Sequence, residues 1–163
     1  QICAVLVADC LPILLADRSG TQVAAIHAGW RGLLAGIIPN TVDAFVARPN
    51  ELIAWIGPAI TTNSYRVEEA LRARFVKADE SAAKHFRNYG TDWYLDLAGL
   101  AYGQLERIGV RSTTSSQLCV YEEQDLFYSY RRDGTTGRMA ALIWISLDSY
   151  RFHLISMGFI AFL

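Results

Sequence analysis

Short apolar runs separated by turn residues occupy the N-terminal part of the chain, and this pattern predicts strands. Ile2–Ala8 is a continuous apolar run rich in β-branched residues, which is typical of a strand buried on both faces. Pro12 limits how that strand continues, Ile13–Ala16 is again apolar, and the turn Asp17–Gly20 precedes a further buried strand over Thr21–Ile26. Because only a short turn joins these strands, we predict an antiparallel hairpin.

Helical spacing follows the hairpin. Apolar residues recur at this spacing over Leu33–Val46, where Pro39 predicts a kink or a fresh start, because a proline inside a helix costs about 3 kcal/mol. Val67–Lys77 is predicted to form another helix. A third helix is expected between Asp96, a good N-cap, and Gly109, a good stop signal.

The remaining segments complete a mixed pattern. Leu52–Ile56 and Met139–Ile145 are predicted as buried strands, Leu126–Arg131 as a strand, and Asp79–Asn88 as a short polar helix. Because strands and helices alternate irregularly, the sequence favours a mixed α/β fold of layered sheets and helices over a regular doubly wound sheet. We expect this fold to form a single domain over residues 1–145.

Both ends of the chain differ from ordinary domain boundaries. Gln1 begins inside an apolar run, so we expect an N-terminal part of the domain to be missing. Residues 146–163 form an apolar C-terminal tail, whose longest uninterrupted apolar run is shorter than the ~20 residues that span a bilayer. This tail is an added element on the core, a dimer contact or non-native sequence beyond the domain.

Composition narrows the class of protein. The 163 residues are 52% hydrophobic, which suffices for one domain with a core, and the net charge is −1. Lys and Arg are scattered without a basic stripe, so we expect no nucleic-acid surface, and no signal peptide or membrane span is visible. The odd number of cysteines, three, indicates a reducing compartment and hence a cytoplasmic protein of undetermined oligomeric state.

Cys10 and His27 are the strongest candidates for chemistry. Each follows an apolar run, so the predicted hairpin can bring a thiol and an imidazole to the same end of a sheet. Such a pair binds a soft or borderline metal or forms a Cys–His nucleophile pair, and the alternative is a buried Cys with a hydrogen-bonded core His. We expect structural roles for Cys3 in the core and for Cys119 in a partly buried loop.

Five motifs carry a resemblance to a known family. They are Ala8–Pro12, His27–Gly32, Gly57–Ile60, Phe127–Asp133 and Thr136–Arg138. In this order they resemble the YfiH-type laccase-domain family, over about residues 2–145. The resemblance implies a layered α/β fold. It also implies either phenol oxidation or zinc-dependent purine nucleoside phosphorolysis, the latter with adenosine deaminase and methylthioadenosine phosphorylase activities.

The same resemblance implies a metal site of one Cys and two His. Cys10 and His27 match two of these ligands, and the family's other His lies in a Val-His-Gly segment upstream of Gln1. Three ligands make chemical sense, because a catalytic zinc usually has three protein ligands and one open position. We do not expect His85, in a polar stretch at the surface, or His153, in the C-terminal tail, to complete the site.

Residues beside the pair are candidates for holding the substrate. Arg31 follows Trp30 at an expected helix N-terminus, where a guanidinium suits phosphate, and the alternative is a surface Arg that stacks on Trp30. Asp9 is either an acceptor that orients a metal ligand or a turn residue. Cys10, His27 and Arg31 are therefore the predicted catalytic residues, with a purine nucleoside and phosphate as ligands.

The motif after residue 126 adds basic and aromatic candidates. Arg131 and Arg132 are adjacent on a predicted strand, so they point to opposite faces and at most one faces the site easily. Tyr128 and Tyr130 point the same way as each other. They stack on a purine ring or pack in the core.

One position departs from the family pattern. Where the family usually has a Tyr-Glu-Val segment, the chain reads Tyr65-Arg66-Val67, so a base replaces an acid. A role of that glutamate therefore does not carry over to this chain.

Four functional hypotheses follow. The first is purine nucleoside phosphorolysis at a zinc site, with the deaminase and methylthioadenosine activities beside it. The second is copper-dependent oxidation of phenols, ranked lower because one Cys and two His cannot hold the several coppers of a laccase. The third is a metal-free cysteine hydrolase with Cys10 as nucleophile and His27 as base. The fourth is an inactive fragment that lacks the upstream ligand.

Overall fold

Three β-sheets form the strand part of this computed structural model, which describes residues 2–147 and 153–162. In order of neighbouring strands, the first sheet is β1 (Ile2–Val7), β9 (Arg138–Leu147) and β10 (His153–Phe162). The second is β3 (Val23–Ala28), β2 (Leu11–Asp17), β4 (Leu52–Ile56) and β8 (Ser112–Ser115). The third is small and consists of β5 (Arg66–Val67), β7 (Asp92–Leu95) and β6 (Phe86–Tyr89).

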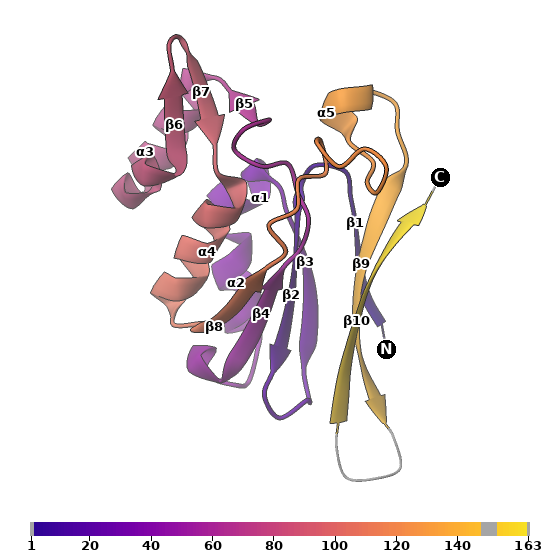
Figure 1. Cartoon of the computed structure of the whole chain (residues 1–163). Coiled ribbons are helices and arrows are strands. Elements are labelled where there is room, and N and C mark those ends of the chain that lie inside the picture. The colour runs from indigo at the N-terminus through magenta and orange to yellow at the C-terminus, as the bar shows by residue number, and fades with distance from the viewer. Residues whose placement is uncertain (1, 148–152, 163) are drawn as a thin grey trace.

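Helices cover one face of the four-stranded sheet. They are α1 (Trp30–Leu34), α2 (Ile37–Asp43) and α4 (Leu97–Ile108), with α3 (Glu69–Ala78) beside the small sheet and α5 (Tyr130–Asp133) near the β1–β2 loop. Figure 1 shows the sheet β1-β9-β10 on one side, the four-stranded sheet in the middle and the helices on the other side. This layering confirms the predicted mixed α/β fold.

The predicted hairpin is the central feature of the four-stranded sheet. Strands β2 and β3 pair antiparallel across the Asp17–Gly20 turn, and the register places Pro12 opposite His27. Strand β3 extends two residues beyond the predicted strand end, so His27 lies inside it. Pro12 is tolerated in a central strand because β4 pairs with β2 only from Ile13 onward.

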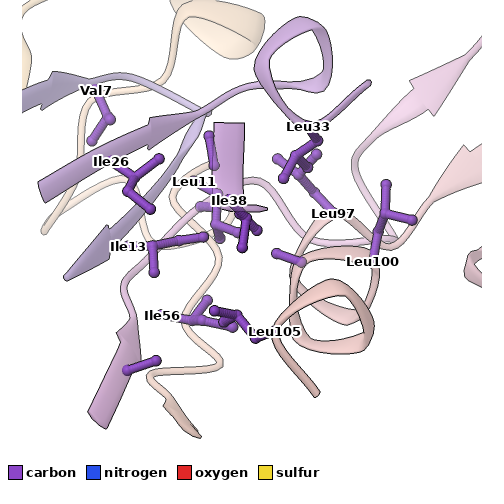
Figure 2. Packing of buried hydrophobic residues seen from close by; sticks show 14 of the residues in the cluster. Val7, Leu11, Ile13, Ile26, Leu33, Ile38, Ile56, Leu97, Leu100 and Leu105 are labelled. Atoms are coloured by element: carbon purple, nitrogen blue, oxygen red, sulfur yellow. The ribbon is translucent and has the colours of Figure 1, made fainter. Parts of the chain in front are cut away.

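The main core lies between the four-stranded sheet and the helices. Figure 2 shows Leu33 of α1 and Leu97, Leu100 and Leu105 of α4 converging with Ile38 and with the labelled apolar residues of the strands. All seven residues of β2 are buried, which explains its continuous apolar sequence. The sheet and the helices therefore bury each other's apolar faces and fix the strand ends that carry the candidate chemistry.

The prediction that the first strand is buried on both faces is wrong. The burial of β1 alternates along the strand, and Ile2 and Leu6 are 62% and 55% exposed. The inward side chains, Cys3 and Val5, pack on a second cluster that contains Ile143 and Leu14, where the two sheets meet. Among the described residues, none buries the outer face of β1 as the second cluster buries its inner face.

The helix predictions hold with shifted boundaries. The run Leu33–Val46 is split into α1 and α2 at Gly36, which has a positive φ of 79°. The fresh start comes at Ile37, and Pro39 fits because it lies in the first turn of α2. Helix α3 starts at Glu69 instead of residue 67.

The boundaries of α4 were predicted correctly. The Asp96 carboxylate accepts a hydrogen bond from Gly99 N at 2.8 Å, and Gly109 ends the helix with a φ of 106°. Local capping interactions are therefore sufficient to determine where this helix begins and ends.

Two segment predictions are wrong in part or in whole. Residues 79–88 form a 3₁₀ helix over Glu80–His85 that gives way to strand β6, so the predicted polar helix ends early. Residues 126–131 form no strand, because Ser129 begins helix α5 and its hydroxyl accepts a hydrogen bond from Arg132 N at 3.2 Å. The last predicted strand is correct and is part of β9.

The C-terminal tail falls partly outside the described residues, which omit 148–152 and 163. Its residues His153–Phe162 form β10, which pairs antiparallel with β9 along its whole length. The predictions of a dimer contact or a non-native sequence remain predictions. No helix in the described ranges is both long and apolar enough to cross a membrane.

Asp17, at the end of β2, is expected to make folding stability depend on acid pH. Burial alone would raise the pKa of its carboxyl, but hydrogen bonds from Ser19, Gln22 and Thr21 outweigh burial and lower the pKa from 3.8 to about 2. This lowering contributes about 2 kcal/mol, which is fully present above pH 4 and is lost as the pH falls towards 2. Urea unfolding of Asp17→Asn should show this deficit at pH 6 and almost none at pH 2. A deficit that does not change with pH contradicts the prediction.

Candidate active site

Cys10 and His27 lie at the same end of the four-stranded sheet, as the hairpin predicted. Cys10 lies in the loop between β1 and β2, and His27 lies in the strand paired with β2. In Figure 1 this loop, α1 and α5 all lie at the upper end of the molecule. Cys10 is half-buried and His27 is exposed, so the imidazole remains accessible from solvent.

Gly29 leaves room between the two candidate ligands. A Cβ atom on Gly29 would lie 2.9 Å from Cys10 Sγ and 3.9 Å from His27 Nε2. The sulfur and the imidazole nitrogen therefore both lie within 4 Å of the place that a side chain at residue 29 would take. They can approach each other there because residue 29 is a glycine.

A thiolate and an imidazole that share such a space fit zinc or copper, because both metals accept sulfur and nitrogen ligands. Within residues 2–147 and 153–162, however, no group of three or more His, Cys, Asp and Glu side chains is placed to hold a metal ion. The described residues therefore offer two candidate donors, and a metal site would need at least one more.

The environment of Cys10 favours the neutral thiol in the absence of a metal. Burial raises the pKa of the Cys10 thiol, and the carboxylate of Asp9 raises it further. The guanidinium groups of Arg31 and Arg138 lower the pKa without reversing the shift. A nucleophilic cysteine needs the opposite shift, because only the thiolate attacks.

Asp9 connects the Cys10 loop to α5. Its backbone has a positive φ of 77°, and its carboxylate accepts hydrogen bonds from Ser129 Oγ and from Arg131 N, both at 2.6 Å. Ser129 is fully buried. The bend after β1 agrees with the interpretation of Asp9 as a turn residue, and its carboxylate also holds a distant segment of the chain beside the site.

The candidate ligands lie in the wall of a hollow of about 420 Å³, which we call the inner hollow. Its lining is Ala8, Asp9, Cys10, His27, Gly29, Trp30, Arg31, Gly32, Ile60, Tyr65, Leu97, Tyr130 and Arg131. All three predicted catalytic residues are therefore in one wall. Small-molecule sites usually have volumes of about 300–1,000 Å³.

Arg31 lines the inner hollow and also stacks on Trp30, with its guanidinium carbon 4.4 Å from the ring centroid. Both interpretations of Arg31 are thus compatible with its position. Helix α1 has only five residues, so the guanidinium is a better anion-binding group than the helix terminus.

Only one of the two adjacent arginines faces the hollow, although not for the predicted reason. Both residues lie on α5 and not on a strand. Arg131 lines the inner hollow, whereas the Arg132 guanidinium donates to the carbonyl oxygens of Val120, Tyr121 and Phe127. Arg132 therefore has a structural role.

The two tyrosines of the same motif, Tyr128 and Tyr130, also take different places in the structure. Tyr130 is 61% exposed and lines the inner hollow, whereas Tyr128 packs against the main core. The sequence reasoning missed Tyr65, which is buried in the wall, with its pKa raised to about 12 by burial and by Cys10. The Tyr65-Arg66-Val67 segment drew attention through Arg66 alone. The tyrosine beside Arg66, in the same family motif, was the signal that could have identified Tyr65.

A second hollow of about 730 Å³, the outer hollow, shares Trp30, Tyr65 and Arg131 with the first. Arg66 and Arg74 also line it. Arg66 is paired with Asp92 across 3.5 Å.

Cys3, Cys119 and His85 line neither hollow. Cys3 is half-buried where the sheets meet, and Cys119 is buried in a loop, 3.9 Å from Ser64 Oγ. The prediction that His85 is a surface residue is wrong, because the imidazole is half-buried against Gly99 and Gly103 of α4. His153 lies in the segment whose side chains fall outside the description.

Comparison with known proteins agrees with the motifs. The family described as multi-copper polyphenol oxidoreductase laccase matches residues 1–146. Purine nucleoside phosphorylase YfiH of Escherichia coli K12 is 44% identical over 144 residues, which are 88% of this chain and 59% of that protein. Purine nucleoside phosphorylase SCO2081 of Streptomyces coelicolor is 45% identical over 145 residues, with 87% and 59% covered. The chain therefore spans about three-fifths of the length of these curated relatives.

Solved structures share the fold. The crystal structure of Neisseria meningitidis protein NMB0706 matches with a TM-score of 0.85 at 45% identity, over 88% of this chain and 60% of that one. YlmD from Geobacillus stearothermophilus matches with a TM-score of 0.77 at 33% identity, over 86% and 56%. The chain therefore belongs to the multi-copper polyphenol oxidoreductase laccase family, as its motifs predicted.

Proposed function

We propose that this chain carries the metal-binding part of an enzyme that cleaves purine nucleosides with phosphate. The observation that carries the proposal is the convergence of Cys10 Sγ and His27 Nε2 on the space above Gly29, in the wall of the inner hollow. The relatives named purine nucleoside phosphorylase support the substrate class.

Cys10 and His27 would hold zinc together with a third donor that the described residues do not supply. When bound, the metal would supply Lewis-acid polarisation or activate a water molecule. Copper suits the same donors, but a single site of this kind cannot hold the several coppers that laccase chemistry needs. Zinc therefore comes first, and copper-dependent phenol oxidation is the second candidate.

The other residues of the inner hollow would bind and orient the substrates. In phosphorolysis, a phosphate oxygen bonds to the sugar C1′ as the C1′–N bond breaks, and the base leaves with the bonding electrons. Arg31 would hold the phosphate by charge-assisted hydrogen bonds. Tyr130, exposed on the rim, would stack on the purine ring.

Adenosine deamination and methylthioadenosine phosphorolysis would use the same hollow, because both substrates contain a purine and a ribose ring. Deamination consumes water and not phosphate. Arg31 would therefore matter for the two phosphorolytic reactions and much less for deamination.

A metal-free cysteine hydrolase is not favoured. Burial and Asp9 raise the pKa of Cys10, whereas catalytic cysteines are activated by a lowered pKa. Labelling of Cys10 by a thiol reagent, faster than labelling of Cys3 and Cys119 in the presence of a chelator, would reverse this ranking.

Phosphate-dependent release of hypoxanthine from inosine tests the proposal. The complete gene product, loaded with zinc, is expected to release hypoxanthine only when phosphate is present. Cys10→Ala and His27→Ala should lower the rate about 100-fold or more, because changes around a metal ligand alone cost about 10–100-fold. Cys119→Ala is the matched control and should retain the rate. No release by the zinc-loaded protein contradicts phosphorolysis.

The same assay separates the inactive-fragment hypothesis from the others. Turnover by the 163-residue chain alone contradicts that hypothesis. Activity of the complete gene product together with an inactive chain supports it.

A further inference from the structure

We propose that Arg31, Arg74 and Arg131 form one anion-binding subsite for a phosphoryl group, at the boundary between the inner and outer hollows. The proposal deepens the proposed function, on which it rests for the reaction in which the anion takes part. It adds Arg74, which no sequence motif indicated, and gives Arg131 a role beside Arg31.

Two of the guanidinium groups lie over one aromatic ring. The guanidinium carbon of Arg31 lies 4.4 Å from the Trp30 ring centroid, and that of Arg74 lies 5.1 Å from it. Trp30 lines both hollows, so it marks their boundary. Arg31 comes from α1 and Arg74 from α3, so the fold brings these charges together from separate elements.

The third guanidinium contacts a different aromatic ring at the boundary. Arg131 of α5 lies 5.2 Å from the centroid of the Tyr65 ring, and its Nη1 donates to Arg66 O at 2.9 Å. The Asp9 carboxylate also fixes its backbone through Arg131 N. These contacts position Arg131, which lines both hollows, before any ligand binds.

The three charges are not neutralised by carboxylates. Ion pairs of the described residues engage Arg66 with Asp92 and Arg72 with Glu69, but none engages Arg31, Arg74 or Arg131. Arg31 and Arg74 each contact the Trp30 ring, and Arg131 contacts the Tyr65 ring and donates one hydrogen bond to Arg66 O. A guanidinium has five N–H donors, so these contacts leave donors for an anion.

The lining of the outer hollow carries three arginines and three carboxylates, and Arg72, which pairs with Glu69 from beside the hollow, makes the balance positive. Of its three acidic residues, Glu69 and Asp92 are in ion pairs, and Glu68 is the remaining carboxylate. Arg74 and Arg131 exceed this single charge, and Arg31 adds to it from the inner hollow. Clefts with an excess of one charge attract ligands of the opposite sign.

A phosphoryl group suits this arrangement, because guanidinium groups bind its oxygens in pairs. It can arrive as inorganic phosphate or as part of a nucleotide. The outer hollow of about 730 Å³ has room for either source. The two sources are separated by experiment.

Steady-state kinetics of the zinc-loaded gene product test the subsite. Arg74→Gln and Arg131→Gln should each raise KM for phosphate about tenfold, and the double variant more, while KM for inosine stays within about twofold. Arg87→Gln is the matched control, because Arg87 is an exposed arginine of β6 that lines neither hollow. An unchanged KM for phosphate in the double variant overturns the proposal.

A binding measurement distinguishes failure of the subsite from failure of the reaction. Phosphorus NMR titration of the protein with phosphate, and separately with inosine monophosphate, needs no turnover. Weaker phosphate binding by the variants supports a site for the free anion, and weaker binding of the nucleotide alone supports a site for a carried phosphoryl group. If neither ligand binds more weakly, the subsite is wrong even where phosphorolysis occurs. If binding weakens but no hypoxanthine is released, only the proposed reaction fails. Thermal melting confirms that each variant is folded.

Discussion

Replacing Gly29 by alanine is expected to weaken metal binding strongly without unfolding the protein. The new Cβ would lie 2.9 Å from Cys10 Sγ, closer than nonbonded carbon and sulfur can approach, so the thiol must turn away from His27. Residue 29 has φ −74° and ψ 168°, an extended conformation that alanine adopts without strain. We expect the zinc dissociation constant to rise about 100-fold or more. Competition with a zinc chelator of known affinity measures it.

The control for this variant is Gly32→Ala, in the same turn. A Cβ at residue 32 would lie 3.4 Å from the nearest atom, Ile37 Cγ2, which is an ordinary contact. This variant should retain zinc with nearly unchanged affinity. If Gly29→Ala also retains zinc, the metal does not bind in the space between Cys10 and His27, and the assignment of both ligands fails.

The meeting of Cys10 with His27 was predictable because it depends on local rules. The Asp17–Gly20 turn is short, and a short turn between apolar runs fixes an antiparallel register. The ends of α4 at Asp96 and Gly109 were likewise predictable, because a capping residue acts on the residues next to it. Where turn and cap chemistry decide the outcome, sequence alone places the residue.

The environment of the site was not predictable, because it depends on distant contacts. The sequence of Leu126–Arg131 predicts a strand, yet Asp9, more than a hundred positions away, holds Arg131 N and Ser129 in a helical turn. Local propensity cannot report a partner that far along the chain. The pairing of Arg131 with Tyr65 has the same origin.

The prediction that β1 is buried on both faces was wrong for a different reason. A continuous apolar run predicts burial on both faces, but Ile2 and Leu6 lie on a face that the described residues leave exposed. The apolar pattern shows that a face suits burial and does not show which part of a protein covers it.

Replacing Asp9 by alanine is expected to destabilise the protein by about 3 kcal/mol, because the change removes two charge-assisted hydrogen bonds and places alanine at a positive φ. Ser129, fully buried, would lose the acceptor of its hydroxyl, and Arg131 N would lose its partner. Urea unfolding at neutral pH measures the loss. Asp43→Ala, at an exposed helix end, is the control and should stay within about 0.5 kcal/mol of the parent.

Asp9→Asn separates the backbone effect from the carboxylate effect. Asparagine tolerates positive φ and keeps one oxygen acceptor, but its amide can satisfy only one of the two donors. We expect it to lose about half as much stability as the alanine variant. Because Arg131 depends on this carboxylate for its position, both variants should also raise KM for phosphate when the folded fraction is held constant by temperature. If stability falls while KM for phosphate does not change, Asp9 supports the fold alone and Arg131 is positioned by Tyr65 and Arg66.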